Sequence, residues 1–197
     1  MNSNNFIHKE LTMKESSIIK KCNTPEKVHN WLNNEIDYNH EPNGKTLQSF
    51  RRVVRSGCAY CLEGALTAAA ILSYHGYAPK ILCIESSRED HNIFIYNNGD
   101  GIRSVSKGDR LYGYDQTRTY KRTRDLVIAY RKDNPHFRGW TILDLRQFDG
   151  LDWITVEDDL WVIEKKLYTM KYHALFHKNG KRMYISPDED GKKLIWV

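Results

Sequence analysis

The first part of the chain shows apolar residues at helical spacing between polar stretches. Thr24 and Pro25 suit the N-cap and first turn of a helix, and apolar residues follow on one face up to Leu32. This pattern predicts a helix with one face packed on a core. A second, shorter helix is predicted over Thr46–Arg55, before a Ser-Gly pair that breaks it.

The next segment is apolar on nearly every side. Its sequence from Ala65 to Leu72 is ALTAAAIL, and a helix without a polar face is a buried one. The helix is expected to stop near Gly76, because glycine readily takes the left-handed conformation that ends helices.

Short runs rich in β-branched and aromatic residues predict strands in the middle of the chain. They cover Lys80–Glu85, His91–Tyr96 and Ile102–Ser106, with turn-forming residues between them. The last two strands are expected to pair as a hairpin. A helix is then predicted over Thr119–Tyr130.

The final third combines a strand-like run, a helix and a hairpin. Thr155 is expected to cap the helix, and an apolar stripe runs from Val156 to Leu167. Asn179-Gly180 is the expected two-residue turn of the hairpin. Helices followed by a block of strands with further helices predict an α+β fold, since regular βαβ alternation is missing from the pattern.

Length and composition add a domain prediction. The 197 residues, of which 40% are hydrophobic and 28% charged, suit one globular domain. Residues 1–22 are polar without a sustained period and are expected to form a flexible N-terminal segment. Residues 23–197 are expected to form the single domain.

The chain carries no apolar run near the roughly 20 residues that cross a bilayer, and its polar start lacks the apolar stretch of a secretory signal. We therefore expect a cytoplasmic protein without a membrane partner. Its four cysteines are expected to be thiols, because disulfide frameworks belong to secreted proteins.

The net charge of +5 is modest, and the densest basic stretches are RRVVR and RTYKRTR, the latter over Arg118–Arg124. A nucleic-acid surface would gather such charges on one face with aromatic residues between them. A solvated helix face explains both stretches more simply, so nucleic acid is not an expected partner.

The candidate chemistry begins at the start of the buried helix. Cys61 falls in its first turn, while Cys58 falls on its approach. Unpaired N–H groups and the positive end of the helix dipole stabilise a thiolate and lower the pKa of a cysteine there. Position therefore favours Cys61 as a nucleophile, and the same N–H groups could hold an oxyanion.

A thiol nucleophile also needs a base, and the chain has eight histidines. His8 and His40 lie in polar segments, and His75 lies at the far end of the buried helix. His91 opens an apolar strand directly after a polar loop, where a side chain is held rigidly and still faces a cleft. The expected base is therefore His91.

The hairpin that follows His91 suggests an orienting residue. With Asn98-Gly99 as a two-residue turn, His91 would lie opposite Ser106. A competing turn at Asp100-Gly101 would instead place Arg110 opposite His91. The first register is preferred.

The order of these features resembles the transglutaminase-like branch of the papain-like cysteine-enzyme superfamily. The stretches CLEGALTAAAIL, HGYAP, DHNIFIY, SVSKGD and DWITVEDDLWVIE, between about Arg52 and Leu167, are similar to a bacterial group of transglutaminase-like proteins. The resemblance implies an α+β fold in which a buried, Cys-bearing helix packs on an antiparallel sheet.

Position by position, the resemblance makes Cys61 the nucleophile and His91 the base. Ser106 stands about where such enzymes carry an Asp. A hydroxyl orients an imidazole but does not stabilise its positive charge as a carboxylate does. Asp109, three residues further on, is the alternative orienting residue.

The expected activity is thiol-dependent acyl chemistry, either amide hydrolysis or acyl transfer, on a peptide, amide or acyl substrate without a metal or organic cofactor. Two alternatives stay open. One is a protein that keeps this fold for binding and has lost catalysis. The other is a thiol redox protein, since Cys58 and Cys61 match CxxC. A zinc site would need further ligands at suitable spacing, which the sequence does not supply.

Overall fold

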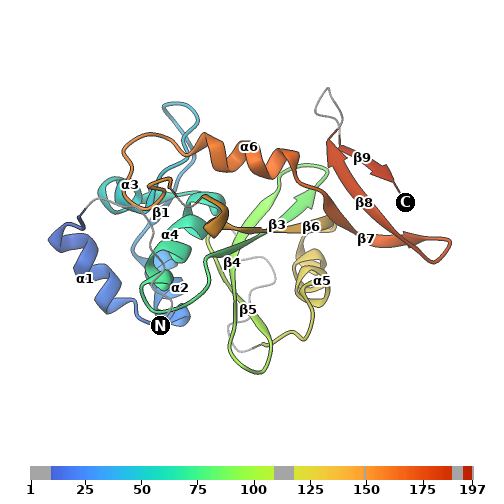
Figure 1. Ribbon diagram of the computed structural model, residues 1–197, viewed down its shortest axis with the longest axis horizontal. Coiled ribbons are helices and arrows are strands. Elements are labelled where there is room, and N and C mark those ends of the chain that lie inside the picture. The colour runs from blue at the N-terminus through green and yellow to red at the C-terminus, as the bar shows by residue number, and fades with distance from the viewer. Residues whose placement is uncertain (1–9, 109–117, 149, 188–192, 197) are drawn as a thin grey trace.

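The computed structural model of the protein describes residues 10–108, 118–148, 150–187 and 193–196 (Figure 1). The described helices are α1 (Met13–Lys21), α2 (Pro25–Asn34), α3 (Phe50–Ser56), α4 (Cys61–Ser73), α5 (Thr123–Asp133) and α6 (Trp161–Thr169). The described strands are β1 (Asp37–Tyr38), β2 (Cys58–Ala59), β3 (Lys80–Ser86), β4 (His91–Asn97), β5 (Ile102–Ser106), β6 (Phe137–Asp144), β7 (Tyr172–Lys178), β8 (Lys181–Pro187) and β9 (Lys193–Trp196).

The strands form one large antiparallel sheet and one small parallel pair. The large sheet has seven strands in the order β5-β4-β3-β6-β7-β8-β9. The parallel pair joins β1 to β2, directly before α4. Mixed helices and an antiparallel sheet confirm the predicted α+β class.

Helices cover both faces of the sheet, and α4 and α5 lie on opposite sides of it (Figure 1). One core lies on the α4 side and includes Cys83 and Phe94. The other lies on the α5 side and includes Ile93, Tyr130 and Phe137. The sheet therefore separates two layers of side chains, and alternate residues of each strand belong to different layers.

As predicted, α4 is buried along its length: every residue from Cys61 to Leu72 is buried. It ends as expected near Gly76, whose φ is +85°. Among the helices that the structure describes, none is both long and apolar enough to cross a membrane.

The N-terminal segment is more ordered than expected over its second half. Thr12 and Glu15 form a reciprocal capping box at the start of α1. Arg51 Nε donates to Glu15 Oε1 over 2.7 Å, and Glu15 and Ile19 are buried. The segment predicted to be flexible therefore contains a packed helix, since a buried ion pair holds α1 on α3. Residues 1–9 lie outside the described part of the chain.

Three helices begin later than predicted because residues at their predicted starts make other contacts. Ser49, not Thr46, caps α3. Tyr120 pairs with Ile102 as an isolated β-bridge, so α5 starts only at Thr123.

The start of α6 shows the largest difference. Thr155 donates its hydroxyl to Asp152, and the chain stays non-helical until Trp161. Asp159 accepts from the Leu47 amide and from Arg52, which ties this stretch to the start of α3. The prediction that Thr155 caps the helix is therefore wrong.

The two predicted hairpins differ in outcome. Asn179 and Gly180 have φ values of 51° and 74°, which confirms the two-residue turn between β7 and β8. In the β4–β5 hairpin, however, Ser106 lies opposite Ile93 rather than His91. Both predicted registers are wrong, because the amide oxygen of Asn98 accepts from the N–H groups of Asp100 and Gly101 and forms a longer loop.

Candidate functional site at Cys61

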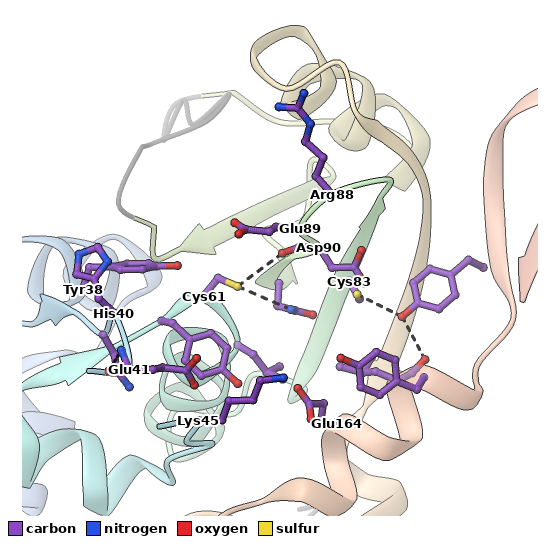
Figure 2. Close-up of a pocket in the computed structure, with 17 residues that line it drawn as sticks. Tyr38, His40, Glu41, Lys45, Cys61, Cys83, Arg88, Glu89, Asp90 and Glu164 are labelled. Atoms are coloured by element: carbon purple, nitrogen blue, oxygen red, sulfur yellow. Dashed lines mark hydrogen bonds between the residues drawn. The ribbon is translucent and has the colours of Figure 1, made fainter. Parts of the chain in front are cut away.

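A pocket of about 730 Å³ opens beside the start of α4 (Figure 2). Its walls come from the β1 segment, the start of α4, the β3–β4 connection, α6 and β7. Its polar and ionisable lining includes Tyr38, His40, Glu41, Lys45, Cys61, Cys83, Arg88, Glu89, Asp90, Asn92, Glu164 and Tyr172. The pocket is rich in ionisable groups of both signs, which suits chemistry or polar recognition rather than a purely apolar ligand.

Cys61 is the first residue of α4, and its sulfur contacts the end of the β3–β4 connection and the start of β4. The thiol donates to the Asp90 carbonyl over 3.9 Å and accepts from Asn92 Nδ2 over 3.8 Å. Figure 2 shows the sulfur directed toward Asp90. The structure places Cys61 at a helix start, as predicted, and also on the wall of a pocket.

The protonation of Cys61 differs from the expectation. Burial raises the pKa of the Cys61 thiol above its ordinary value. The Asn92 backbone and side-chain amides and the Leu62 N–H at the helix start act in the opposite direction, but desolvation of the thiolate outweighs them. The helix start alone does not produce a thiolate at neutral pH, so nucleophilic attack requires a proton acceptor.

His91 lies on the other side of the sheet. Its Nε2 is 2.9 Å from Ser106 Oγ, and its ring stacks on Phe137 at a centroid distance of 6.3 Å. The Tyr130 ring lies 5.7 Å away. The structure therefore brings His91 and Ser106 together, as expected for an orienting pair, but on the α5 side, while Cys61 is on the α4 side.

The separation follows from the alternation of side chains along β4. Asn92 faces Cys61, so its neighbour His91 faces the opposite layer. The sequence did not reveal this, because His91–Tyr96 is buried on both faces and carries apolar residues at odd and even positions alike. Ser106 reaches His91 diagonally, since the directly opposite residue is Ile93. Asp109, the alternative orienting residue, lies outside the described residues.

A different histidine lines the Cys61 pocket. His40 follows β1, and the pairing of β1 with β2 carries it to the mouth of the pocket. Its ring is 4.9 Å from that of Tyr38, and Figure 2 shows both residues on one side of Cys61. Sequence reasoning set His40 aside as part of a polar segment. The signal that was missed is its position directly after a strand that pairs with the approach to α4.

Glu63 fixes the wall that carries His40. This fully buried carboxylate accepts from Thr46 Oγ1 at 2.7 Å and from the Gln48 amide N–H at 2.9 Å with one oxygen. The other oxygen accepts from Asn39 Nδ2, Tyr60 N–H and Gln48 Nε2 at 3.0 to 3.3 Å. The pocket wall is therefore attached to the first turn of α4 by one side chain.

The remaining cysteines occupy distinct surroundings. Cys58 contacts Ser56 and Gln48, and both Cys58 and Cys61 are free thiols. Cys83 lies in the same pocket as Cys61 and accepts from the Tyr172 hydroxyl over 3.3 Å. Within the described ranges, no three His, Cys, Asp or Glu side chains gather in a way that could hold a metal ion.

Comparison with known proteins adds no assignment. No protein-family model matches the chain, and no curated protein matches it. The transglutaminase-like resemblance thus rests on the motifs of the sequence alone.

Proposed function

We propose that the protein is a cysteine hydrolase or acyltransferase of transglutaminase-like fold, with Cys61 as its nucleophile. One observation carries the proposal: Cys61 is the first residue of a fully buried helix and its sulfur lines a polar pocket of about 730 Å³. The packing of that helix on an antiparallel sheet supports the proposed fold.

The proposed reaction passes through a thioester. The Cys61 sulfur loses its proton to a base and adds to the carbonyl carbon of an amide, and the amine then leaves with that proton. Water or a second amine adds to the thioester carbonyl and releases the free thiol. The Asn92 amide and the N–H groups at the start of α4 are the hydrogen-bond donors beside the sulfur, where the oxyanion would develop.

The proposal gives the role of proton acceptor to His40. Its imidazole lines the same pocket as the sulfur, whereas the His91 ring lies behind the sheet against Phe137. His91 and Ser106 then support the start of β4 and, with it, the position of Asn92. The raised pKa of Cys61 makes such a base necessary.

An acylation experiment tests this proposal. Wild-type protein is mixed with p-nitrophenyl acetate, release of p-nitrophenol is followed, and the acylated residue is located by mass spectrometry. Acylation of the nucleophile should give an initial burst of p-nitrophenol. Cys61→Ala should abolish this burst, and Cys58→Ala should retain it. His40→Gln should slow acylation by about 100-fold, as expected for loss of a general base, and His91→Gln should leave it close to wild type. Loss in His91→Gln with retention in His40→Gln would transfer the base role to His91.

A second candidate function is binding without catalysis. It is favoured by the raised pKa of Cys61 and by its contacts with Asp90 and Asn92 in place of an imidazole. In that case p-nitrophenol is released without a burst, and Cys58 and Cys61 react equally slowly with the ester. That outcome would overturn the enzyme proposal.

A further inference from the structure

A second pocket, of about 690 Å³, lies between the start of α5 and strands β6, β7 and β8. Its lining includes Arg122, Arg124, Trp140, Ile142, His173, His177 and Arg182. The start of α5 contributes to its lining, whereas the start of α4 contributes to the lining of the Cys61 pocket; Figure 1 shows these two helices on opposite sides of the sheet. Adjacent residues of β7 divide between the two pockets: Tyr172 lines the Cys61 pocket and His173 lines the second.

The lining is strongly basic. Three arginines and two histidines contribute to it, and among the described residues no carboxylate does. Asp125 pairs with Arg122 at 2.9 Å on the exposed side. In the part of the chain that the structure describes, Arg124 and Arg182 have no ion-pair partner. Arg124 acts on Asp125 electrostatically without forming an ion pair with it, so two guanidinium groups without an ion-pair partner among the described residues line one cavity.

Arg124 is fixed by one hydrogen bond, while another of its N–H groups has no acceptor among the described residues. Its Nη2 donates to the Leu175 carbonyl over 2.8 Å, which fixes the guanidinium between α5 and β7. Its Nε is buried and makes no hydrogen bond within the described structure. An unsatisfied buried donor costs free energy, and an anion in the pocket would offset the charge of the same guanidinium group.

The first turn of α5 also favours an anionic ligand. The N-cap residue, Arg122, provides no side-chain hydrogen bond to the helix start, and α5 has 11 residues. Free N–H groups at the start of such a helix favour phosphate and carboxylate ligands. Thr123, the first residue of α5, lines the pocket.

Aromatic rings form a row across the strands beside these charges. Trp140 and His173 are cross-strand partners with ring centroids 5.3 Å apart. Tyr184 is the next partner, 5.5 Å from His173, and Lys171 Nζ lies 3.6 Å above its ring. Partial desolvation together with the nearby Arg182 and Lys171 lowers the pKa of His173. Flat rings beside cations are the surface on which nucleobases stack.

We propose that this pocket binds a nucleotide, with the phosphates at Arg124, Arg182 and the start of α5 and the base on the Trp140–His173 row. The volume lies within the range of small-molecule sites. The RTYKRTR stretch thereby acquires a function that the sequence did not indicate, because the fold brings Arg124 beside Arg182 and Trp140. The proposal is independent of Cys61 chemistry.

The nucleotide is either free or part of a single strand, and a binding experiment distinguishes the two sources. The full chain is titrated calorimetrically with ATP, pyrophosphate and an eight-residue oligothymidylate. Tighter binding of ATP indicates a free nucleotide, and tighter binding of the oligonucleotide indicates a strand. Binding of neither, or pyrophosphate binding as tight as ATP binding, overturns the proposal.

Three variants locate the site. Arg182→Glu should weaken nucleotide binding by about tenfold, since it removes a charge-assisted contact and adds repulsion. Trp140→Leu should weaken binding of ATP by about fivefold or more through loss of stacking, while leaving pyrophosphate binding unchanged. Lys165→Glu makes the same charge change on the exposed side of α6 and should have no effect. Because Arg182 is exposed, its variant tests the proposal even if Trp140→Leu destabilises the fold. Equal losses in Arg182→Glu and Lys165→Glu contradict it.

Discussion

The side-chain amide of Asn92 donates to the sulfur of Cys61 over 3.8 Å. This contact shows that the Cys61 thiol lies on the α4 side of the sheet. It commits Asn92 to the α4 side, and its neighbour His91 therefore faces Ser106 on the α5 side. The environment of Cys61 is therefore set by an amide, and the groups able to exchange a proton with it belong to the walls of its own pocket.

Asn92→Leu removes that amide and keeps the branched shape and the number of side-chain heavy atoms. Because the Asn92 side chain lowers the pKa of Cys61, the pKa should rise further, and the pH profile of Cys61 alkylation should move to higher pH. Asn92 Oδ1 is buried without a partner, so the free energy of unfolding should stay within about 1 kcal/mol of wild type or increase. Cys58 alkylation in the same variant is the internal control. An unchanged Cys61 profile would rule out the assigned role of the amide.

Glu63→Gln should destabilise the protein by about 2–4 kcal/mol, because the new NH₂ group faces the hydroxyl and backbone N–H groups that donate to the carboxylate. The measurement is urea unfolding at pH 7. Glu157→Gln is the matched control. Its carboxylate pairs with Arg55 and is 48% exposed, so its loss should cost only about 0–1 kcal/mol. Similar costs for both variants would contradict the role assigned to Glu63.

His29 should make stability depend on pH. Burial, with a smaller effect of the Lys107 charge, lowers the pKa of His29 to about 4 from 6.5. Between these values the unfolded chain binds more protons than the folded one, so this stabilisation is complete above pH 6.5 and is lost as the pH falls toward 4. The full effect is about 3 kcal/mol.

Urea unfolding at several pH values between 4.5 and 7 measures this effect. His29→Leu should reduce the slope of unfolding free energy against pH in that window. Substitution of the exposed His177 by Asn should keep the wild-type slope. Equal slopes for wild type and His29→Leu would show that the imidazole does not couple to folding.

Gly64→Ala should destabilise the fold although alanine favours helices. A Cβ at this position would lie 2.5 Å from the Lys107 Cβ. Overpacking of this kind costs about 1–3 kcal/mol, more than the roughly 1 kcal/mol gained from helix propensity. In the double variant with Lys107→Gly the clash is gone, so the two substitutions should be strongly non-additive in a double-mutant cycle. Additive costs would refute the close approach.

Local rules predicted most of the elements. The cap at Thr24, the uninterrupted apolar run of α4 and the Asn179-Gly180 turn each depend on neighbours a few residues apart, and each is found in the structure. The predicted cap at Thr155 is absent because the Thr155 hydroxyl donates to Asp152 instead. A capping rule does not take this competing partner into account.

The site was less predictable because it depends on which face of the sheet each strand residue occupies and on contacts between residues far apart in the sequence. β4 is apolar at odd and even positions, so no pattern said which layer His91 would join. His40 reaches the pocket only through the pairing of β1 with β2, and Arg124 reaches Arg182 only through the docking of α5 on β7. Contacts of this kind are set by the assembled sheet and not by local sequence.

Tyr172 and His173 are neighbours in β7 but line different pockets, and this arrangement limits which sequence changes the strand tolerates. Substitutions at either residue alter one pocket and leave the other intact. A one-residue slip of β7 against its neighbours would instead exchange the side chains that the two pockets receive. Related chains that retain both pockets should therefore vary in the loops flanking β7 and keep the number of residues within it constant.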